Sequence, residues 1–217
     1  MSKYYIHACP DRMWYVDGYL VPSIKEQGIE NIIVKCDYER VGNLKSCMNI
    51  FESIGEGGGS WHLQDDVVIC RDFKKRTEEI DNYIVCGFVI KHDNNISYEG
   101  LVPPEKMWWS FPCIYIPNMI ARDCAHWVNE RAKMIAMYSW MAMSGKNDDY
   151  LFREFLKLYY PNQKIINLKP NLVDHVDYLL GGTTVNHQRK NKDVRAAYFE
   201  DIDLVEELEK KIGSNNG

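Results

Sequence analysis

Apolar residues follow two patterns along the first 90 residues of the chain, and the two patterns alternate. Short, nearly continuous apolar runs are typical of buried strands, whereas apolar residues three or four positions apart indicate amphipathic helices. The short runs predict strands over residues 4–9, 31–37 and 84–90, and a strand from Trp61 that ends at the adjacent carboxylates Asp65 and Asp66. The helical spacing predicts helices over 11–26, which Gly28 ends, and over 41–54. Such alternation is typical of βαβ units and of a mostly parallel sheet.

The rest of the chain is less regular and richer in helix. Residues 101–117 contain four prolines and are expected to form an extended loop with short strands. The apolar spacing predicts helices over 119–144, 148–158 and 204–212, and a short strand over 165–168. The tail 213–217 is expected to be frayed. No repeat or linker divides the chain, so we expect a single α/β domain over 1–217.

Composition and charge narrow the function classes. The chain of 217 residues is 46% hydrophobic and 26% charged, as is ordinary for a globular protein. Its formal net charge of −5 argues against a dedicated basic nucleic-acid binder, although a local basic groove stays open. No run reaches the ~18 apolar residues that a membrane span needs, and no signal-peptide pattern begins the chain. With seven cysteines but no Cys-x-x-Cys pair, we expect a cytoplasmic protein with reduced, buried thiols.

The stretch Trp61–Val68 is the most informative, because it reads as a buried strand that ends in two adjacent carboxylates, Asp65 and Asp66. Buried carboxylates are unfavourable unless a cation or hydrogen-bond donors compensate them. Open α/β sheets bind ligands at the carboxyl ends of their strands. A divalent cation holding a diphosphate would therefore explain both the charge and its position. The alternative is that the two aspartates cap a turn or the following helix.

Several motifs, taken in order, resemble those of nucleotide-sugar glycosyltransferases of the GT-A fold. They are Asp37 after the second predicted strand, Val41-Gly42-Asn43, Leu63-Gln64-Asp65-Asp66-Val67, Pro170-Asn171-Leu172-Val173-Asp174-His175 and Arg195-Ala196-Ala197. The resemblance implies a GT-A type, Rossmann-like three-layer sandwich with a mostly parallel central sheet. Residues 1–90 would form the nucleotide-binding half, and 91–200 the acceptor half with a closing segment.

The same resemblance implies a site for Mn²⁺ or Mg²⁺, in which Asp66 and His175 are the expected metal ligands. Asp65 alternates to the other face of the strand, where it would act in catalysis by holding the donor sugar or binding through water. Gln64 stands where relatives carry the first acid of the motif. Without the family pattern, a lone His such as His175 is more often structural.

A set of polar residues is expected to contact the nucleotide donor. The set comprises Pro10, Asp11, Arg12, Asp37, Arg40, Asn43, Gln64, Arg189 and Arg195. Arginines near a diphosphate would supply charge-assisted, bidentate hydrogen bonds. The alternatives are a turn acid for Asp37 and solvated side chains for the basic residues.

The acceptor side rests on fewer residues. Trp108 and Trp109 lie in the proline-rich segment, where exposed rings would stack on an acceptor and buried rings would anchor the loop. An inverting enzyme needs a carboxylate base near the acceptor hydroxyl, for which Asp123 and Glu105 are candidates. A retaining enzyme can act without such a base.

We therefore expect a metal-dependent hexosyl- or pentosyltransferase that moves a sugar from a nucleotide-sugar donor, with UDP as the expected nucleotide, to a hydroxyl acceptor. The acceptor would be a glycan precursor or, as a minority option, a hydroxylated base in DNA, against which the acidic net charge weighs. The alternatives are a nucleotidyltransferase of similar α/β fold and a catalytically inactive nucleotide-sugar-binding module.

Overall fold

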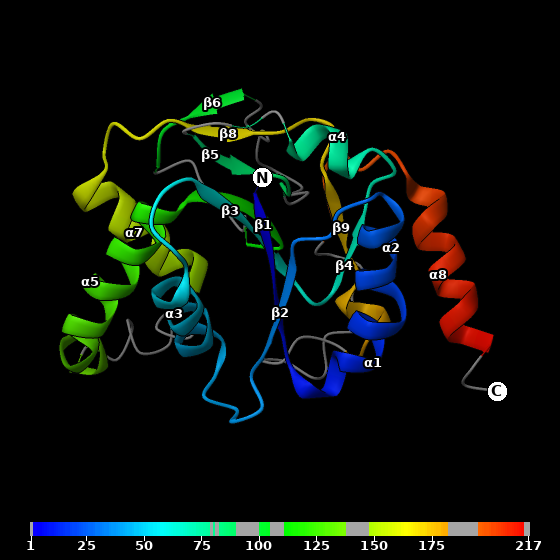
Figure 1. Cartoon of the computed structure of the whole chain (residues 1–217), viewed down its shortest axis with the longest axis horizontal. Helices are drawn as coiled ribbons and strands as arrows, with labels where there is room; N and C mark the ends of the chain where they lie inside the picture. The colour runs from blue at the N-terminus through cyan, green and yellow to red at the C-terminus, as the bar shows by residue number, and fades with distance from the viewer. Residues whose placement is uncertain are drawn as a thin grey trace.

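A mixed seven-stranded sheet passes through the centre of the protein, as a computed structural model of the chain shows (Figure 1). The structure describes residues 2–78, 80, 83–89, 100–104, 111–137, 148–181 and 195–214. The strand order is β2-β1-β3-β7-β5-β8-β6. The strands are β1 (Lys3–Ala8), β2 (Ile32–Cys36), β3 (Gly59–Gln64), β5 (Ile84–Cys86), β6 (Gly100–Val102), β7 (Cys113–Pro117) and β8 (Ile165–Asn167).

The expected mostly parallel sheet is confirmed only in part. β1 pairs in parallel with β2 and β3, and β5 pairs in parallel with β8. However, β7 lies antiparallel between β3 and β5, and β6 is antiparallel to β8. The parallel strands β2, β1 and β3 nevertheless end at one common edge, which is the edge expected to carry the site. Strands from 1–90 and from 91–200 interleave in this sheet, so the two halves form one compact body.

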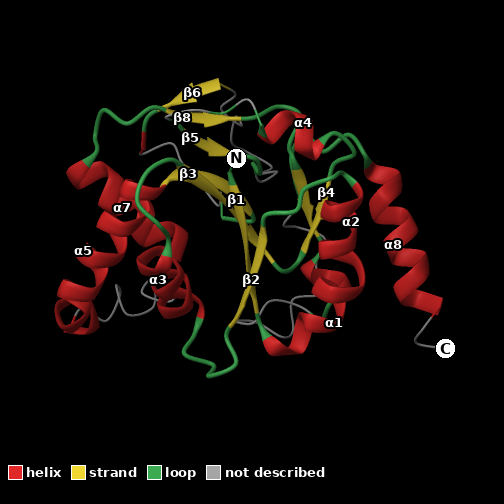
Figure 2. Ribbon diagram, viewed as in Figure 1, coloured by secondary structure: helices red, strands yellow, loops and turns green. Residues whose placement is uncertain are grey.

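Helices cover both faces of the sheet (Figure 2). Alternate residues of β1 enter different cores, because Tyr4 and Ile6 face one side and Tyr5 the other. The first side packs against a helical segment of four parts, against α4 (Phe73–Thr77) and against α8 (Ile202–Ser214). The second side packs against α3 (Asn43–Ser53), α5 (Asn118–Met137) and α7 (Asp148–Tyr159).

The four-part helical segment confirms the helix predicted over 11–26. It consists of a 3-10 turn (Pro10–Arg12), α1 (Met13–Tyr15), a π-helical turn (Val16–Leu20) and α2 (Val21–Glu26). Pro22 follows the π turn and has no backbone N–H for the i−4 carbonyl, so the wider turn lies where the regular hydrogen bond is missing. Gly28 ends the segment with a φ of +74°, a conformation that glycine adopts readily.

The buried strand expected from Trp61 to the paired carboxylates is confirmed. β3 ends at Gln64, the chain turns at Asp65–Asp66, and β4 (Val67–Ile69) begins a second sheet. There β4 pairs antiparallel with β9 (Val173–His175). The short strand β4 was not predicted, because Val67 and Ile69 directly follow the turn and are as deeply buried in the second sheet as Leu63 is in the first.

Most other predicted elements are present with shifted ends. The strand expected over 84–90 is shorter, since β5 ends at Cys86 and residue 90 lies outside the described residues. α5 accounts for the helix expected over 119–144 as far as Met137, and 138–144 are not described. α8 continues to Ser214, so 213–214 are helical rather than frayed. Within the described ranges, no helix is long and apolar enough to cross a membrane.

Candidate functional site

The two aspartates lie where three parallel strands end, in the turn between the two sheets. The 3-10 turn that begins with Pro10 starts at the same edge, directly after β1. The backbone N–H of Cys9 donates to Asp65 Oδ2 at 2.7 Å, which ties the exit of β1 to the exit of β3. This contact is one that a turn-capping carboxylate makes. Asp65 therefore has a clear structural partner.

Arg12 lies between the two carboxylates. Its Nη1 donates to Asp65 Oδ1 at 2.8 Å and also to Asp66 Oδ2. Arg12 is only 4% exposed, and both aspartates are equally well covered. The sequence predicted Arg12 beside the nucleotide, and the structure turns its guanidinium inward onto the two acids. A guanidinium is always charged and here neutralises part of the acidic pair, while a contact of Arg12 with the nucleotide stays a prediction.

His175 reaches the same acids from the other end of the chain. The antiparallel pairing of β4 and β9 sets Val67 opposite His175, and the N–H of Val176 donates to the carbonyl of Asp66 at 2.8 Å. The His175 Nε2 atom consequently lies 3.2 Å from Asp66 Oδ2. The two residues that the sequence predicted as metal ligands are thus brought together by the fold.

A third carboxylate completes the acidic cluster, which we define as Arg12, Asp65, Asp66, His175 and Asp177. Asp177 Oδ1 lies 3.2 Å from His175 Nδ1, on the opposite side of the ring from Asp66. Sequence reasoning missed Asp177. The available signal was its position two residues after His175, directly beyond the strand that carries the histidine.

The charges of the acidic cluster are strongly coupled. Burial acts to raise the pKa of Asp66, but His175 and Arg12 outweigh it and hold that pKa below its usual value. Burial and the neighbouring Asp66 raise the pKa of Asp65, against the pull of Arg12. Burial would lower the pKa of His175, yet Asp66 and Asp177 raise it to about 10. A protonated His175 and Arg12 therefore face three carboxylates.

The cluster is not fully satisfied by these contacts. Asp66 Oδ1 and both oxygens of Asp177 are buried and have no hydrogen-bond partner. Buried carboxylate oxygens normally accept hydrogen bonds or bind cations. Carboxylate oxygen and imidazole nitrogen are donors that Mn²⁺ accepts. Asp66 and His175 thus fit two positions around such an ion, although the described residues contain no group of three His, Cys, Asp or Glu ligands.

Asp37 and Arg40, both predicted to contact the nucleotide donor, have partners within the protein. Both oxygens of Asp37 accept backbone N–H groups, from Val41 and Gly42, each at 3.0 Å. This is the turn-closing arrangement considered for Asp37, and a nucleoside contact stays a prediction. Arg40 is exposed, has a φ of +52° and pairs with Asp11 at 2.9 Å.

Three further donor candidates are also held by protein groups. Asn43 Nδ2 donates to Asp148 Oδ1 at 3.1 Å, which links α3 to α7. Gln64 is the last residue of β3, and its N–H donates to the carbonyl of Pro112 at 3.2 Å. Arg195 Nε donates to Asp174 Oδ2 at 2.6 Å. Arg195 therefore connects its segment to β9 through Asp174, the residue that precedes His175.

Of the remaining candidates, the structure describes only Asp123, which is not part of the acidic cluster. Trp108, Trp109, Glu105 and Arg189 lie outside the described residues. Asp123 is exposed, accepts a hydrogen bond from Tyr160 and lies near the start of α5. Because β7 runs antiparallel to β3, α5 begins at the edge where β3 starts, not at the edge where Asp65 follows it.

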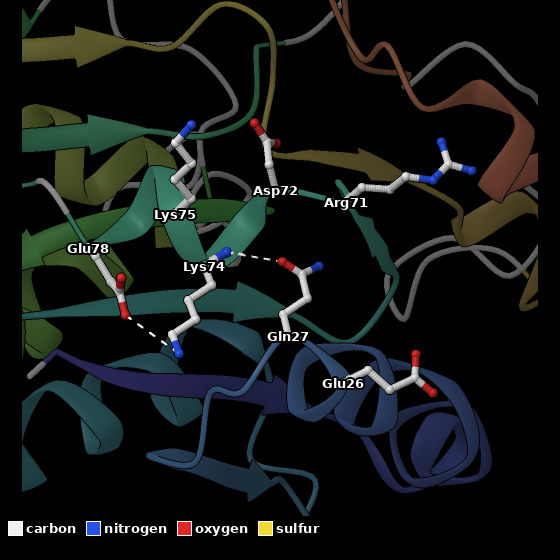
Figure 3. A pocket seen from close by; sticks show the side chains of 7 residues that line it. All are labelled: Glu26, Gln27, Arg71, Asp72, Lys74, Lys75 and Glu78. Atoms are coloured by element: carbon white, nitrogen blue, oxygen red, sulfur yellow. Dashed lines mark hydrogen bonds and ion pairs between the residues drawn. The ribbon is translucent and has the colours of Figure 1, made fainter.

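An open surface pocket lies elsewhere, between the end of α2 and α4 (Figure 3). Its lining residues are Glu26, Gln27, Arg71, Asp72, Lys74, Lys75 and Glu78. They mix both signs of charge, and Lys74 Nζ lies 3.9 Å from Glu78. The helical segment runs back from the exit of β1, so the pocket lies near the edge where the parallel strands begin. It is not part of the acidic cluster.

Comparison with known proteins adds no family to this description. No protein-family model matches the chain. No curated protein matches it with significant similarity. The function must therefore be argued from the residues and their geometry.

Proposed function

We propose that the protein is a metal-dependent glycosyltransferase of the GT-A type, with Asp66 and His175 as its metal ligands. The observation that carries the proposal is the 3.2 Å approach of His175 Nε2 to Asp66 Oδ2. The motif resemblance paired these two residues, although they are far apart in the chain. The position of the pair at the exit of parallel strands is where α/β sheets bind nucleotides.

The charge of the acidic cluster supports the need for a further cation. Arg12 and His175 both pair with Asp66 Oδ2, whereas Asp66 Oδ1 is buried without a hydrogen-bond partner. Divalent cations that act on phosphates are commonly held by one or two protein carboxylates and complete their coordination with phosphate oxygens and water. A bound Mn²⁺ or Mg²⁺ would neutralise the charge that develops on a nucleoside diphosphate leaving group.

The other residues of the site hold and orient these ligands. Asp65 connects the exit of β1 to the acidic turn through the amide of Cys9, and it shares Arg12 with Asp66. Protein atoms cover all but a few per cent of both acids, so a diphosphate can approach only if neighbouring side chains move. Arg12 is the side chain in contact with both acids and is released in this proposal as the ligand arrives.

The geometry favours this reaction over nucleotidyl transfer. A nucleotidyltransferase would present a glycine-rich, basic loop after the first strand to hold a triphosphate. Here the corresponding residues form a 3-10 turn, and its arginine is buried against Asp65 and Asp66. The substrate class we propose is a UDP-linked hexose or pentose with a hydroxyl acceptor.

The proposal is tested by thermal unfolding with UDP and UDP-sugars, each with and without Mn²⁺. A ligand that binds only the folded state raises the melting temperature, so UDP and Mn²⁺ together should raise it more than either alone. Asp66→Asn should abolish this joint effect and metal-dependent donor hydrolysis while the chain stays folded. Asp174→Asn is the matched control, because Asp174 is equally buried but binds Arg195 and backbone N–H groups, and it should keep the joint effect.

The outcomes separate the alternatives. Binding of UDP with Mn²⁺ but no transfer or hydrolysis of any donor would favour an inactive nucleotide-sugar-binding module. The absence of any response to Mn²⁺ and UDP in the wild-type chain would overturn the proposal. Unchanged activity in Asp66→Asn would remove Asp66 from the site.

A further inference from the structure

Asp177 is a buried carboxylate that the proposed function does not yet use. It begins the 3-10 turn Asp177–Leu179, directly after β9, and is 1% exposed. Neither of its oxygens accepts a hydrogen bond, and its charged neighbour is the ring of His175 at 3.2 Å. A buried carboxylate lowers the stability of the folded state unless a cation or a hydrogen-bond donor compensates its charge.

The two nitrogens of His175 face different carboxylates. Nε2 lies 3.2 Å from Asp66 Oδ2, and Nδ1 lies 3.2 Å from Asp177 Oδ1. The second contact is an ion pair, and Nδ1 makes no hydrogen bond in this geometry. A histidine that binds a metal through one nitrogen usually donates the N–H of the other to a carboxylate or carbonyl. That second contact fixes which nitrogen carries the hydrogen and how the ring is turned.

We propose that Asp177 is a positioning residue that holds the His175 ring with Nε2 toward Asp66, so that both ligands face one cation. This inference rests on the proposed function, because it assumes that Asp66 and His175 bind Mn²⁺ or Mg²⁺. Asp177 itself stays on the far side of the ring and does not enter the coordination of the ion. Its effect reaches the ion only through the orientation of the imidazole.

A second acid beside His175 shows what a purely structural carboxylate looks like here. Asp174 is as deeply buried as Asp177. Its Oδ1 accepts N–H groups from Ala196 at 2.8 Å and from His175 at 2.9 Å, and its Oδ2 binds Arg195. Asp174 thus secures the backbone around β9, whereas Asp177 faces the ring and is otherwise unused.

The experiment measures Mn²⁺ affinity of the whole chain without any donor or acceptor. The paramagnetic resonance signal of free Mn²⁺ is followed during titration of wild type, Asp177→Asn and Asp174→Asn. Loss of an outer carboxylate behind a histidine ligand typically weakens metal affinity by about 10- to 100-fold, and we expect a loss of that size in Asp177→Asn. Asp174→Asn removes an equally buried charge without touching the ring, so its affinity should stay close to that of wild type.

A second readout needs no metal at all. In ¹⁵N spectra of the metal-free chain, with the His175 signals assigned by comparison with His175→Gln, Asp177→Asn should shift the Nδ1 resonance far more than Asp174→Asn does. Asp177→Glu keeps a carboxylate and should bind Mn²⁺ more tightly than Asp177→Asn. If Asp177→Asn does not fold, Asp177→Ser is measured in its place.

The outcomes distinguish failure of the positioning role of Asp177 from failure of the metal site itself. Wild-type affinity in Asp177→Asn or its replacement would overturn the positioning role alone. An equal loss in Asp174→Asn would also overturn it, because the effect would then follow from disturbing β9. A wild-type chain that binds no Mn²⁺ would overturn the proposed function and, with it, this inference.

Discussion

Two networks of buried polar side chains adjoin opposite faces of β3. They differ in whether every polar atom that links the network has a hydrogen-bond partner. The acidic cluster at the end of β3 is charged and leaves carboxylate oxygens unpaired. The other network, which we call the neutral chain, consists of His7, His62, Ser60 and Asn118. Both networks contain histidine, yet the pKa of His175 is raised and the pKa of His62 is lowered.

The hydrogen bonds of the neutral chain can be assigned donors and acceptors in only one way. Asn118 Nδ2 donates to the carbonyls of Gly55 and Gly57, so its Oδ1 accepts the one hydroxyl hydrogen of Ser60. Ser60 Oγ can then only accept from His62 Nε2, at 3.0 Å. The Nδ1 atom of His62 is left as the acceptor for His7 Nε2, at 2.9 Å. His62 is therefore neutral and carries its ring hydrogen on Nε2, and each link of the chain has its partner.

The contrast shows that the surroundings of a buried histidine decide whether its pKa is lowered or raised. Burial lowers the pKa of His62 and brings that of His7 to about 4, because no carboxylate compensates the charged form. At His175 two carboxylates outweigh the same burial. A closed neutral network specifies packing, whereas an open charged one keeps an unmet interaction for a ligand. The predictions below test this division, from the largest expected effect to the smallest.

Replacing Arg12 by Met should cause the largest loss of stability. Arg12 is the common partner of Asp65 and Asp66, and its removal leaves two buried carboxylates facing each other. Removing one partner of a buried ion pair typically destabilises a protein by about 3–5 kcal/mol. Urea denaturation at neutral pH, with and without Mn²⁺, would measure the loss. If the acidic cluster is a cation site, Mn²⁺ should restore part of the stability.

Arg40→Met is the matched control for that change. Arg40 lies in the same region of the sequence and pairs with Asp11, but both side chains are exposed. Water already solvates such charges, so the urea midpoint should hardly move. A loss in Arg12→Met no larger than in Arg40→Met would contradict the view that Arg12 neutralises the acidic cluster.

Breaking the neutral chain should have an intermediate effect on stability and none on metal binding. Asn118→Ala removes the acceptor of Ser60 and the donor to two loop carbonyls. Leaving buried polar groups unpaired costs about 1–3 kcal/mol. Ser53→Ala, which removes a hydroxyl bonded only within its own helix, is the control and should change little. A change of Mn²⁺ affinity in Asn118→Ala would show that the two networks are not independent.

The sequence predicted the elements of the fold better than their pairing. Burial of one face at helical spacing identified the helices, and apolar runs identified β1, β2 and β3. The antiparallel insertion of β7 between β3 and β5 left no local signal, because strand order depends on contacts that are distant in sequence. The separate strand β4 was missed for the related reason that both sheets bury the residues beside the turn.

The sequence predicted that Asp66 and His175 come together, but not which side chains neutralise the acids. The pair follows from motif order, and the fold brings the two residues together, while their role as metal ligands stays a prediction. Arg12 was expected at the correct edge of the sheet, but its contact with the two acids was not predicted, since sequence cannot show whether an arginine turns toward solvent or toward buried acids. Asp177 carries no motif, and only its contact with the His175 ring distinguishes it from any acid after a strand.

Per pH unit, the smallest predicted effect is a difference in the slope of stability with pH between the two networks. The folded-state pKa of His175, about 10, lies above its unfolded value near 6.5, so its stabilisation is complete below about pH 6.5 and is lost as the pH rises toward 10. The folded-state pKa of His62 is lowered, so its contribution is complete above about pH 6.5 and is lost as the pH falls. Each group can change the unfolding free energy by at most about 1.4 kcal/mol per pH unit.

Urea denaturation of the metal-free chain between pH 4.5 and 9.5 would measure these slopes, the range being set by the unfolded value of about 6.5. The advantage of wild type over His175→Gln should shrink toward alkaline pH, because only wild type loses the charged histidine there. The advantage over His62→Gln should shrink toward acidic pH, because only wild type must keep that ring neutral. Parallel pH profiles for the two variants would show that both histidines meet the same environment, and the division between a closed neutral chain and an open charged cluster would then fail.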